Sequence, residues 1–238
     1  MSPPRALARL SAVFLDAGGT LLCERSSRAA LYSEAAREAG LDIGEVEMRE
    51  RMYRIHDSLP RRLGKHFRYS HGWFEAYIEA LFVGGLGLAP QRLPALAEGL
   101  FERFSDARNF RLMPGAMQLV EHLSRRGLCV AVVSNWSEAL PGLLEGLGLG
   151  PYLRFSVVSS LEGCEKPERE IFERALERAG ADPSATLHAG NDVERDVRGA
   201  RAAGILPVLV SRVVPTSESC ERVDDLAGLE RLIQELAP

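Results

Sequence analysis

Acidic, hydroxyl and amine side chains recur in this chain directly after short apolar runs. The run Ala12–Leu15 leads into Asp16-Ala17-Gly18-Gly19-Thr20, and the run Cys129–Val133 leads into Ser134-Asn135. Two further polar clusters follow apolar segments, Glu165-Lys166-Pro167 and the stretch from Gly190 to Asp196. Because residues at the carboxyl ends of parallel strands meet in one crevice, we expect these four clusters to converge.

Together the four clusters offer a carboxylate nucleophile, hydroxyls, an ammonium group and a pair of further carboxylates. Acidic oxygen ligands suit Mg²⁺, which binds one or two carboxylates together with water and substrate phosphate oxygens. An ammonium and a hydroxyl suit a phosphoryl group, whose charge is spread over three oxygens. Lys166 also precedes Pro167 at a predicted helix start, where the helix dipole favours an anion. The alternative for Asp16 is a structural turn in which the carboxylate accepts hydrogen bonds from nearby backbone N–H groups.

The elements that must position these groups fall into two kinds. After the first strand, apolar periodicity predicts helices over 26–39, 45–58, 73–82 and 91–104, with a basic loop over 61–71. From Pro114 helices and strands alternate, which predicts a mostly parallel sheet covered by helices. The predicted strands are 129–133, 155–158, 186–189 and 206–210, and the predicted helices are 115–126, 138–147, 167–179, 196–203 and 226–236.

The first strand has no crossover partner near it in the sequence. We therefore predict an α/β fold in which a doubly wound core, residues 1–22 and 107–238, carries an inserted all-helical cap, residues 23–106.

Composition narrows the class of protein. The chain has 238 residues, 46% of them hydrophobic, and a net charge of −4, which does not favour nucleic acid or an acidic membrane as a partner. The four cysteines lack C-x-x-C spacing and are expected to be free thiols. No apolar stretch is long enough to span a bilayer, and Ser2-Pro3-Pro4-Arg5 lacks the apolar segment of a signal peptide, so we expect a cytoplasmic protein that binds a small molecule.

The order and spacing of these motifs resemble the haloacid dehalogenase (HAD) superfamily of hydrolases with an inserted, C1-type helical cap. The resemblance rests on Asp16-x-x-Gly19-Thr20, Ser134-Asn135, Lys166-Pro167, and His188-x-Gly190-Asn191-Asp192 with Asp196. It covers essentially the whole chain.

The resemblance implies a role for each matching residue. Asp16 would be the nucleophile that forms an aspartyl intermediate and also a metal ligand, and Lys166 would neutralise developing charge. Thr20 and Ser134 would hold phosphate oxygens, while Asn135 would fix its loop and donate to the substrate. An acidic residue of the fourth motif would complete the coordination of Mg²⁺, with Asn191 and Asp196 in support.

Gly18 is the first departure from the family pattern. Phosphatases of the family usually carry an aspartate there as general acid and base, whereas the metal uses only the backbone carbonyl of that position. We therefore expect Mg²⁺ binding to survive and proton donation to be lost. General acid catalysis is typically worth about 10²- to 10⁴-fold, so the deficit should be large for alkyl phosphates and small for leaving groups that depart as stable anions.

Asn191 is the second departure. Spacing of the motif as G-D-x-x-x-x-D puts Asn191 at the aspartate position, whereas the spacing G-D-x-x-x-D gives the ligand role to Asp192. We favour Asp192.

The leading prediction is a Mg²⁺-dependent phosphatase of a small phosphorylated metabolite. Its rivals are a HAD-fold binding protein with little turnover, a 2-haloacid dehalogenase, and a phosphonate hydrolase that would use Lys65, the cap's sole lysine, as a Schiff base. Glu24 is a candidate replacement acid, and the basic loop either gathers anionic substrate or is an exposed linker. Trp73, Phe74 and Tyr77 are expected to pack the cap, and His188 to have a structural role.

Overall fold

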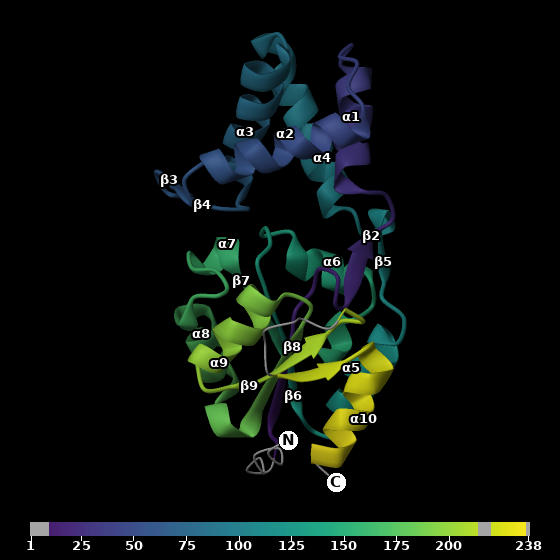
Figure 1. Ribbon diagram of the computed structural model, residues 1–238, viewed down its shortest axis with the longest axis vertical. Helices are drawn as coiled ribbons and strands as arrows, with labels where there is room; N and C mark the ends of the chain where they lie inside the picture. Colours follow the sequence, from purple (N-terminus) through teal and green to yellow (C-terminus); the bar gives the residue numbers. More distant parts are fainter. Residues whose placement is uncertain (1–9, 214–219, 237–238) are drawn as a thin grey trace.

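Six strands form a central parallel sheet in the order β10-β9-β8-β1-β6-β7 (Figure 1). The structure, a computed structural model, describes residues 10–213 and 220–236, so the segment Ser2–Arg5 lies outside the described residues. The strands are β1 (Ala12–Leu15), β6 (Cys129–Ser134), β7 (Phe155–Val158), β8 (Thr186–Gly190), β9 (Leu206–Val210) and β10 (Glu221–Val223). The predicted α/β class with a mostly parallel sheet is therefore confirmed.

Strand β1 lies in the middle of the sheet and is buried on both faces. Val13 and Leu15 belong to one hydrophobic cluster, whereas Ala12 and Phe14 belong to another. Side chains alternate between the two faces of a strand, so a strand covered on both sides is apolar at every position. Leu15 pairs with Val132 of β6 and Ala189 of β8, which brings the carboxyl ends of the three strands together.

Helices cover both faces of the sheet. One face packs against α5 (Ala116–Arg125), α6 (Leu140–Gly146) and α10 (Leu226–Leu236), and the other against α8 (Arg169–Ala179) and α9 (Gly199–Ala202). A short helix, α7 (Ser159–Glu162), follows β7. The predicted segment 196–203 differs most, because a π-helical turn over Val193–Arg198 precedes α9.

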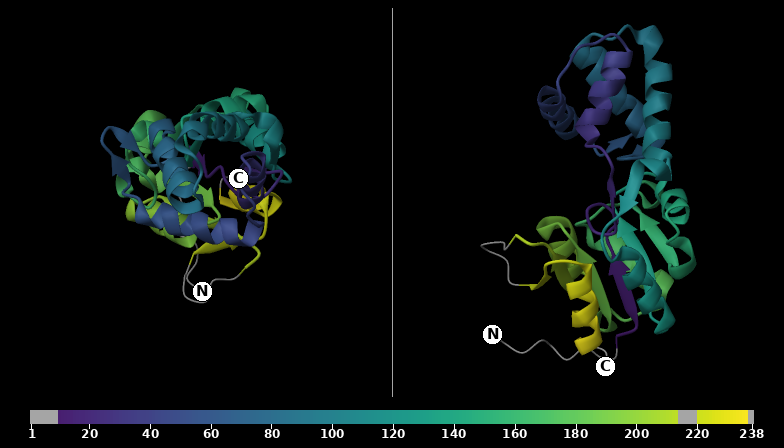
Figure 2. Two further views of the ribbon diagram at one scale, coloured as in Figure 1. Left: turned by 90° about the horizontal axis from the view of Figure 1, so that it is seen from above. Right: turned by 90° about the vertical axis from the view of Figure 1, so that its right-hand side faces the viewer.

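Four helices of the segment between β1 and β6 form a body of their own beyond the sheet (Figures 1 and 2). They are α1 (Arg28–Glu38), α2 (Glu45–Ser58), α3 (His71–Ile78), which continues as a π-helical turn over Glu79–Gly84, and α4 (Leu93–Ser105). Tyr32, Trp73, Tyr77 and Phe82 lie in a separate hydrophobic cluster of this body. We call this body, together with the hairpin described next, the cap; the boundary of its insertion, residues 23–106, stays a prediction.

Two short antiparallel pairs were missed by the sequence patterns. Strand β2 (Leu22–Glu24) pairs with β5 (Phe110–Leu112) and carries the chain into and out of the cap. Strand β3 (Arg62–Leu63) and β4 (His66–Phe67) form a hairpin inside the predicted basic loop. Strands of two or three residues are too short to show an alternating pattern, which is why they were not predicted.

The described part of the chain contains no helix long and apolar enough to cross a membrane. Cys23, Cys129 and Cys164 are free thiols, as expected.

Candidate functional site

A buried row of three charged side chains lies where the strands end. Asp16 follows β1, and its Oδ1 accepts a hydrogen bond from Lys166 Nζ at 2.6 Å. The same ammonium donates to Asp196 Oδ1, also at 2.6 Å. Asp16, Lys166 and Asp196 are 6%, 3% and 2% exposed, so the ammonium group is shared by two carboxylates out of water.

Two hydroxyl groups contact the Asp16 carboxylate. Ser134, the last residue of β6, donates from Oγ to Asp16 Oδ1 at 3.0 Å. Thr20 donates from Oγ1 to Asp16 Oδ2 at 3.4 Å, across a turn in which Gly19 adopts a positive φ of 78°. Oδ1 is therefore held by two donors at close range, whereas Oδ2 has one long contact.

Asn135 fixes the backbone of Lys166 from the neighbouring strand end. Its Nδ2 donates to the Lys166 carbonyl at 2.9 Å, and its Oδ1 accepts from the Lys166 N–H at 2.8 Å. This reciprocal pair orients the loop that carries the ammonium group. The two hydrogen bonds agree with the predicted role of Asn135 in fixing the loop, and its contact with the substrate stays a prediction.

His188 contacts the row of charged side chains through Asp196. It is fully buried on β8, with Nε2 2.9 Å from Asp196 Oδ1 and its ring 5.0 Å from the ring of Phe172. Nδ1 has no hydrogen-bond partner among the described residues. His188 contacts Asp196 and not Asp16, which agrees with a structural role.

Burial and mutual charge shift the pKa values within this row. Burial raises the pKa of Asp16, and the charge of Asp196 adds to this rise while Lys166 opposes it. Burial acts to lower the pKa of Lys166, but the two carboxylates outweigh it and raise that pKa. Burial likewise acts to raise the pKa of Asp196, but Lys166 and His188 overcome it and hold that pKa well below its usual range. The row is thus an ammonium held between an ionised Asp196 and a nucleophile that burial makes more basic.

In the fourth cluster, Asp192 and Asn191 have different surroundings. Asp192 begins the π-helical turn, where its Oδ1 accepts from the Arg195 N–H at 2.8 Å, and its side chain is 40% exposed. Asn191 instead lies against the nucleophile turn, because a Cβ built on Gly19 would stand only 2.4 Å from Asn191 Nδ2. The carboxylate of Asp192 is engaged in capping, which weakens the expectation that it faces Asp16.

A cavity of about 730 Å³ lies above the row, between the sheet and the cap. Asp16, Thr20, Ser134, Lys166 and Asp196 are called the floor below. The cap side is lined among others by Arg28, Tyr32, Phe74, Tyr77, Phe101 and Phe104, and these six residues are called the roof. An acidic floor with a lysine therefore faces an aromatic roof.

Aromatic side chains of the cap pack against one another and also line the cavity. Trp73 and Tyr77 are stacked with ring centroids 5.6 Å apart, and both are nearly buried, which fits the expected packing role. Both also line the cavity, as does Phe74. Tyr32, Phe104 and, on the core side, Trp136 were not predicted as site residues, since aromatic residues at helical spacing are more often core.

A profile of the haloacid dehalogenase-like hydrolases matches residues 10–204, which include the floor and the roof. The chain belongs to this family. Among its relatives is the haloacid dehalogenase-like hydrolase domain-containing protein 3 of Bos taurus, 30% identical over 204 residues that cover 84% of this chain and 81% of the relative. A phosphoserine phosphatase of Thermus thermophilus is 33% identical over 165 residues, covering 65% of this chain and 64% of that protein.

Solved structures show the same HAD fold. The HAD-hydrolase YfnB of Bacillus subtilis bound to magnesium superposes with a TM-score of 0.73 and 19% identity, covering 95% of this chain and 99% of that one. The resemblance stated from the motifs is thus confirmed at the level of family and fold.

The side chains around Asp16 offer few ligands for a divalent cation. Within residues 10–213 and 220–236, no group of three or more His, Cys, Asp or Glu side chains is arranged to hold a metal ion. Asp16 Oδ2 has only the long contact with Thr20, and the amide of Asn191 lies against the nucleophile turn. Mg²⁺ often takes one or two carboxylates and completes its shell with water and substrate oxygens, so this smaller set still fits it.

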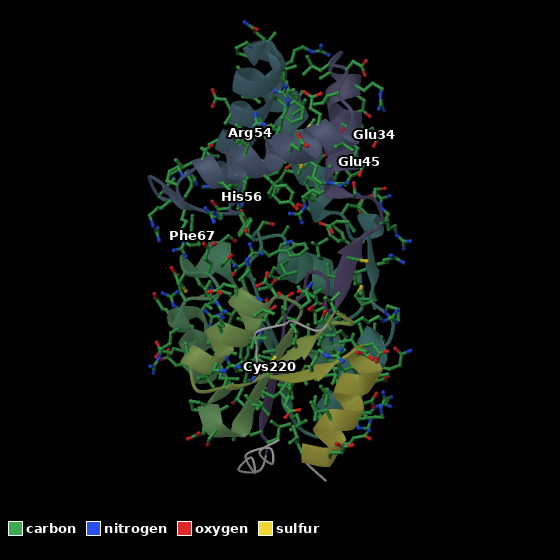
Figure 3. All side chains as sticks on the ribbon, viewed as in Figure 1. Glu34, Glu45, Arg54, His56, Phe67 and Cys220 are labelled. Atoms are coloured by element: carbon green, nitrogen blue, oxygen red, sulfur yellow. The ribbon has the colours of Figure 1, made fainter. Side chains whose placement is uncertain are left out.

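The basic loop of this HAD cap docks on the core. Arg61 contacts Glu165 at 2.6 Å and Glu168 at 2.5 Å, and Arg68 lies 3.5 Å from Glu165. Lys65 is exposed in the tight turn of the hairpin and does not line the cavity. In Figure 3, His56 and Phe67 lie at the edge of the cap that faces the core. These contacts favour a docking role for the loop, and the exposed position of Lys65 outside the cavity lining does not favour a Schiff base there.

Proposed function

We propose that this HAD-like hydrolase removes the phosphoryl group of a small phosphorylated metabolite through an aspartyl-phosphate on Asp16. One observation carries the proposal: Lys166 and Ser134 hold Oδ1 of Asp16, while Oδ2 has only the 3.4 Å contact with Thr20. One oxygen of a buried carboxylate is thus oriented for attack beneath a cavity of metabolite size. A relative named a phosphoserine phosphatase supports the class of reaction.

The proposed reaction has two steps. Asp16 Oδ2 attacks phosphorus, and the bond between phosphorus and the ester oxygen breaks with its electron pair on the leaving oxygen. Water then attacks the aspartyl-phosphate, which releases inorganic phosphate and restores the carboxylate. Ser134 and Thr20 donate hydrogen bonds to phosphoryl oxygens, and Lys166 neutralises the charge that develops on them.

The proposal includes Mg²⁺, which would neutralise phosphate charge when bound. Asp16 and the Gly18 carbonyl would hold it, and the third protein oxygen would come from Asn191 or Asp192. Because Asn191 lies against Gly19, we favour its amide oxygen. Calorimetric titration with MgCl₂ tests this choice: Asn191→Ala should weaken binding more than Asp192→Ala.

The test of the catalytic proposal is phosphate release from p-nitrophenyl phosphate with Mg²⁺. Asp16→Asn keeps the shape of the side chain and removes the nucleophilic oxygen, so we expect a loss of at least about 10³-fold in kcat/KM. Equal rates for the two proteins would remove the proposal. They would favour the rival in which this HAD fold binds a ligand without turnover.

A second candidate is dehalogenation of a 2-haloacid, in which Asp16 would attack carbon instead of phosphorus. The neutral Asn191 beside the nucleophile turn favours it, because release of halide needs no acidic metal site. The test is chloride release from a 2-chloroacid by the wild-type protein. Release that depends on Asp16 but not on Mg²⁺ would show that the protein is a dehalogenase.

A further inference from the structure

The indole of Trp136 occupies the space that a side chain at position 18 would need. A Cβ built on Gly18 would stand 2.9 Å from Trp136 Cζ3, with Cε3 and Cη2 at 3.7 and 3.8 Å. The φ of Gly18 is not in the left-handed region, so the backbone itself accepts a larger residue. The obstacle to any side chain at this position, two residues beyond the nucleophile, is therefore the aromatic ring.

The backbone of Trp136 is anchored beside this space. Its N–H donates to Ser159 Oγ at 3.1 Å, and Ser159 Oγ donates back to the Trp136 carbonyl at 3.3 Å. The indole also contacts Phe110, with ring centroids 6.0 Å apart. Ser159 is fully buried as the first residue of α7, directly after β7, so the backbone of Trp136 is tied to this edge of the core.

None of the other carboxylates that line the cavity is placed as a free proton donor. Glu24 accepts two hydrogen bonds from Arg28, at 3.1 and 2.5 Å. Asp196 is held by Lys166 and His188, and Asp192 caps the π-helical turn. Asp57 is 81% exposed on the cap beside His56. The core side of the cavity thus presents an apolar ring where a general acid would act.

The roof offers a surface that suits a flat apolar group. Phe104 contacts Tyr32 at 5.5 Å and Phe74 at 6.2 Å between ring centroids, and the Arg28 guanidinium lies 5.7 Å over the Phe104 ring. Aromatic rings bind one another in offset or edge-to-face contact, which gains about 0.5–1.5 kcal/mol beyond burial of area.

We infer that the substrate is an aryl phosphate, a phosphate ester of a phenol-type hydroxyl, and that Trp136 is a residue that sets this specificity. The inference rests on the proposed function of Asp16. When Asp16 attacks phosphorus, the electron pair of the broken P–O bond stays on the phenolate oxygen, which is stable without protonation and takes its proton later from water. An alkoxide needs a proton as it leaves, and Trp136 excludes the side chain that would supply it.

The test is the dependence of kcat/KM on the leaving group. Aryl phosphates whose phenols span pKa values from about 7 to about 10, together with a simple alkyl phosphate, are assayed with the wild-type protein and Mg²⁺. Without a general acid, we expect kcat/KM to fall steeply as the pKa of the leaving group rises. The value for the alkyl ester should be at least about 10³-fold below that for the best aryl ester.

The assay has four distinguishable outcomes. A steep decline supports the inference, whereas a shallow profile with aspartyl-phosphate on Asp16 overturns it and leaves the proposed function standing. If the dependence on the leaving group is shallow in the wild type and steep in His56→Gln, the cap supplies the proton, and this result also overturns the inference. No turnover of any ester by the folded protein, and no label on Asp16, would overturn both.

A pair of substitutions tests Trp136 directly. Gly18→Asp alone should gain nothing on the alkyl phosphate, because the indole leaves no room for the carboxylate. Gly18→Asp combined with Trp136→Ala should raise the alkyl rate by about 10²-fold and make the profile shallower, since a donor then has room to act. Trp136→Ala alone and Gly18→Asp with Trp136→Phe are the matched controls, and circular dichroism checks their folding. Equal gains in Gly18→Asp with and without Trp136→Ala would contradict the role of Trp136.

Discussion

The floor and the roof of the cavity are held together by different forces. In the floor, the charged atoms of Asp16, Lys166 and Asp196 bond to one another, and all three residues are nearly buried. In the roof, aromatic rings contact one another, and the ion pair of Arg28 with Glu24 is partly open, with side chains 49% and 23% exposed. The floor is thus preorganised for one chemistry, while the roof shapes what that chemistry acts on.

The difference follows from how each region is built. Asp16 and Ser134 stand at the ends of strands whose register is set by sheet hydrogen bonds. Lys166 and Asp196 lie farther along the chain and are held in the row by the hydrogen bonds of the Lys166 ammonium group. The roof sits on helices joined to the core through the short β2–β5 pair and the docked hairpin. We therefore expect floor substitutions to remove activity and stability together, and roof substitutions to change the choice and affinity of substrate.

The largest expected effect outside Asp16 is that of Lys166→Met. The substitution leaves two buried carboxylates without their cation, and breaking a buried ion pair typically costs about 3–5 kcal/mol in the free energy of unfolding. Urea unfolding measures this loss, and we expect activity to fall by about 10³-fold as well. Lys65→Met, at the chain's other lysine, is the matched control and should change neither quantity. Normal stability in Lys166→Met would show that the floor does not depend on its charges.

The second prediction concerns pH. Lys166 and His188 lower the pKa of Asp196 in the folded protein, so its stabilising contribution is complete above the unfolded value of about 3.9 and is lost as pH falls below it. At pH 3 the wild type should lose about 1 kcal/mol from this group, whereas Asp196→Asn has no such group to protonate. The urea midpoints of the two proteins should therefore differ less at pH 3 than at pH 6. If the two midpoints differ by the same amount at both pH values, Asp196 stabilises the protein through packing and not through its charge.

The floor was more predictable from the sequence than the roof. Asp16 and Ser134 each belong to a motif at a strand end, and Lys166 to the motif that follows the next strand and α7 along the chain. Parallel strands bring such ends together whatever the details of the helices. The position of Asn191 against Gly19 could not be predicted, because it depends on a π-helical turn with no sequence pattern of its own. The contact between Trp136 and Gly18 depends on one side-chain conformation across two strands, which periodicity does not describe.

The third prediction concerns the aromatic side chains of the roof. Phe104→Leu removes an aromatic face beside Tyr32 and Phe74 while keeping an apolar side chain. We expect KM for an aryl phosphate to rise about tenfold with kcat nearly unchanged, because the lost contact is the same in the ground and transition states. Acetyl phosphate, which has no ring, should be unaffected. Phe155→Leu, a partly buried aromatic outside the cavity lining, is the control. A fall in kcat with unchanged KM would show that the roof acts on the chemical step.

The smallest expected effect tests the docking of the cap. Arg61 is 45% exposed and pairs with the nearly buried Glu165, which immediately precedes Lys166. An ion pair with one exposed partner contributes about 0–1 kcal/mol, so Arg61→Gln should barely change the urea midpoint. It should still raise KM by a few-fold, because a cap that is docked for a smaller fraction of the time offers a complete cavity less often. Arg169→Gln, which breaks an exposed pair with Glu173 away from the cavity, is the matched control. If both variants leave KM unchanged, the hairpin contacts do not contribute to closure, and the roof is positioned by the β2–β5 pair and helix packing alone.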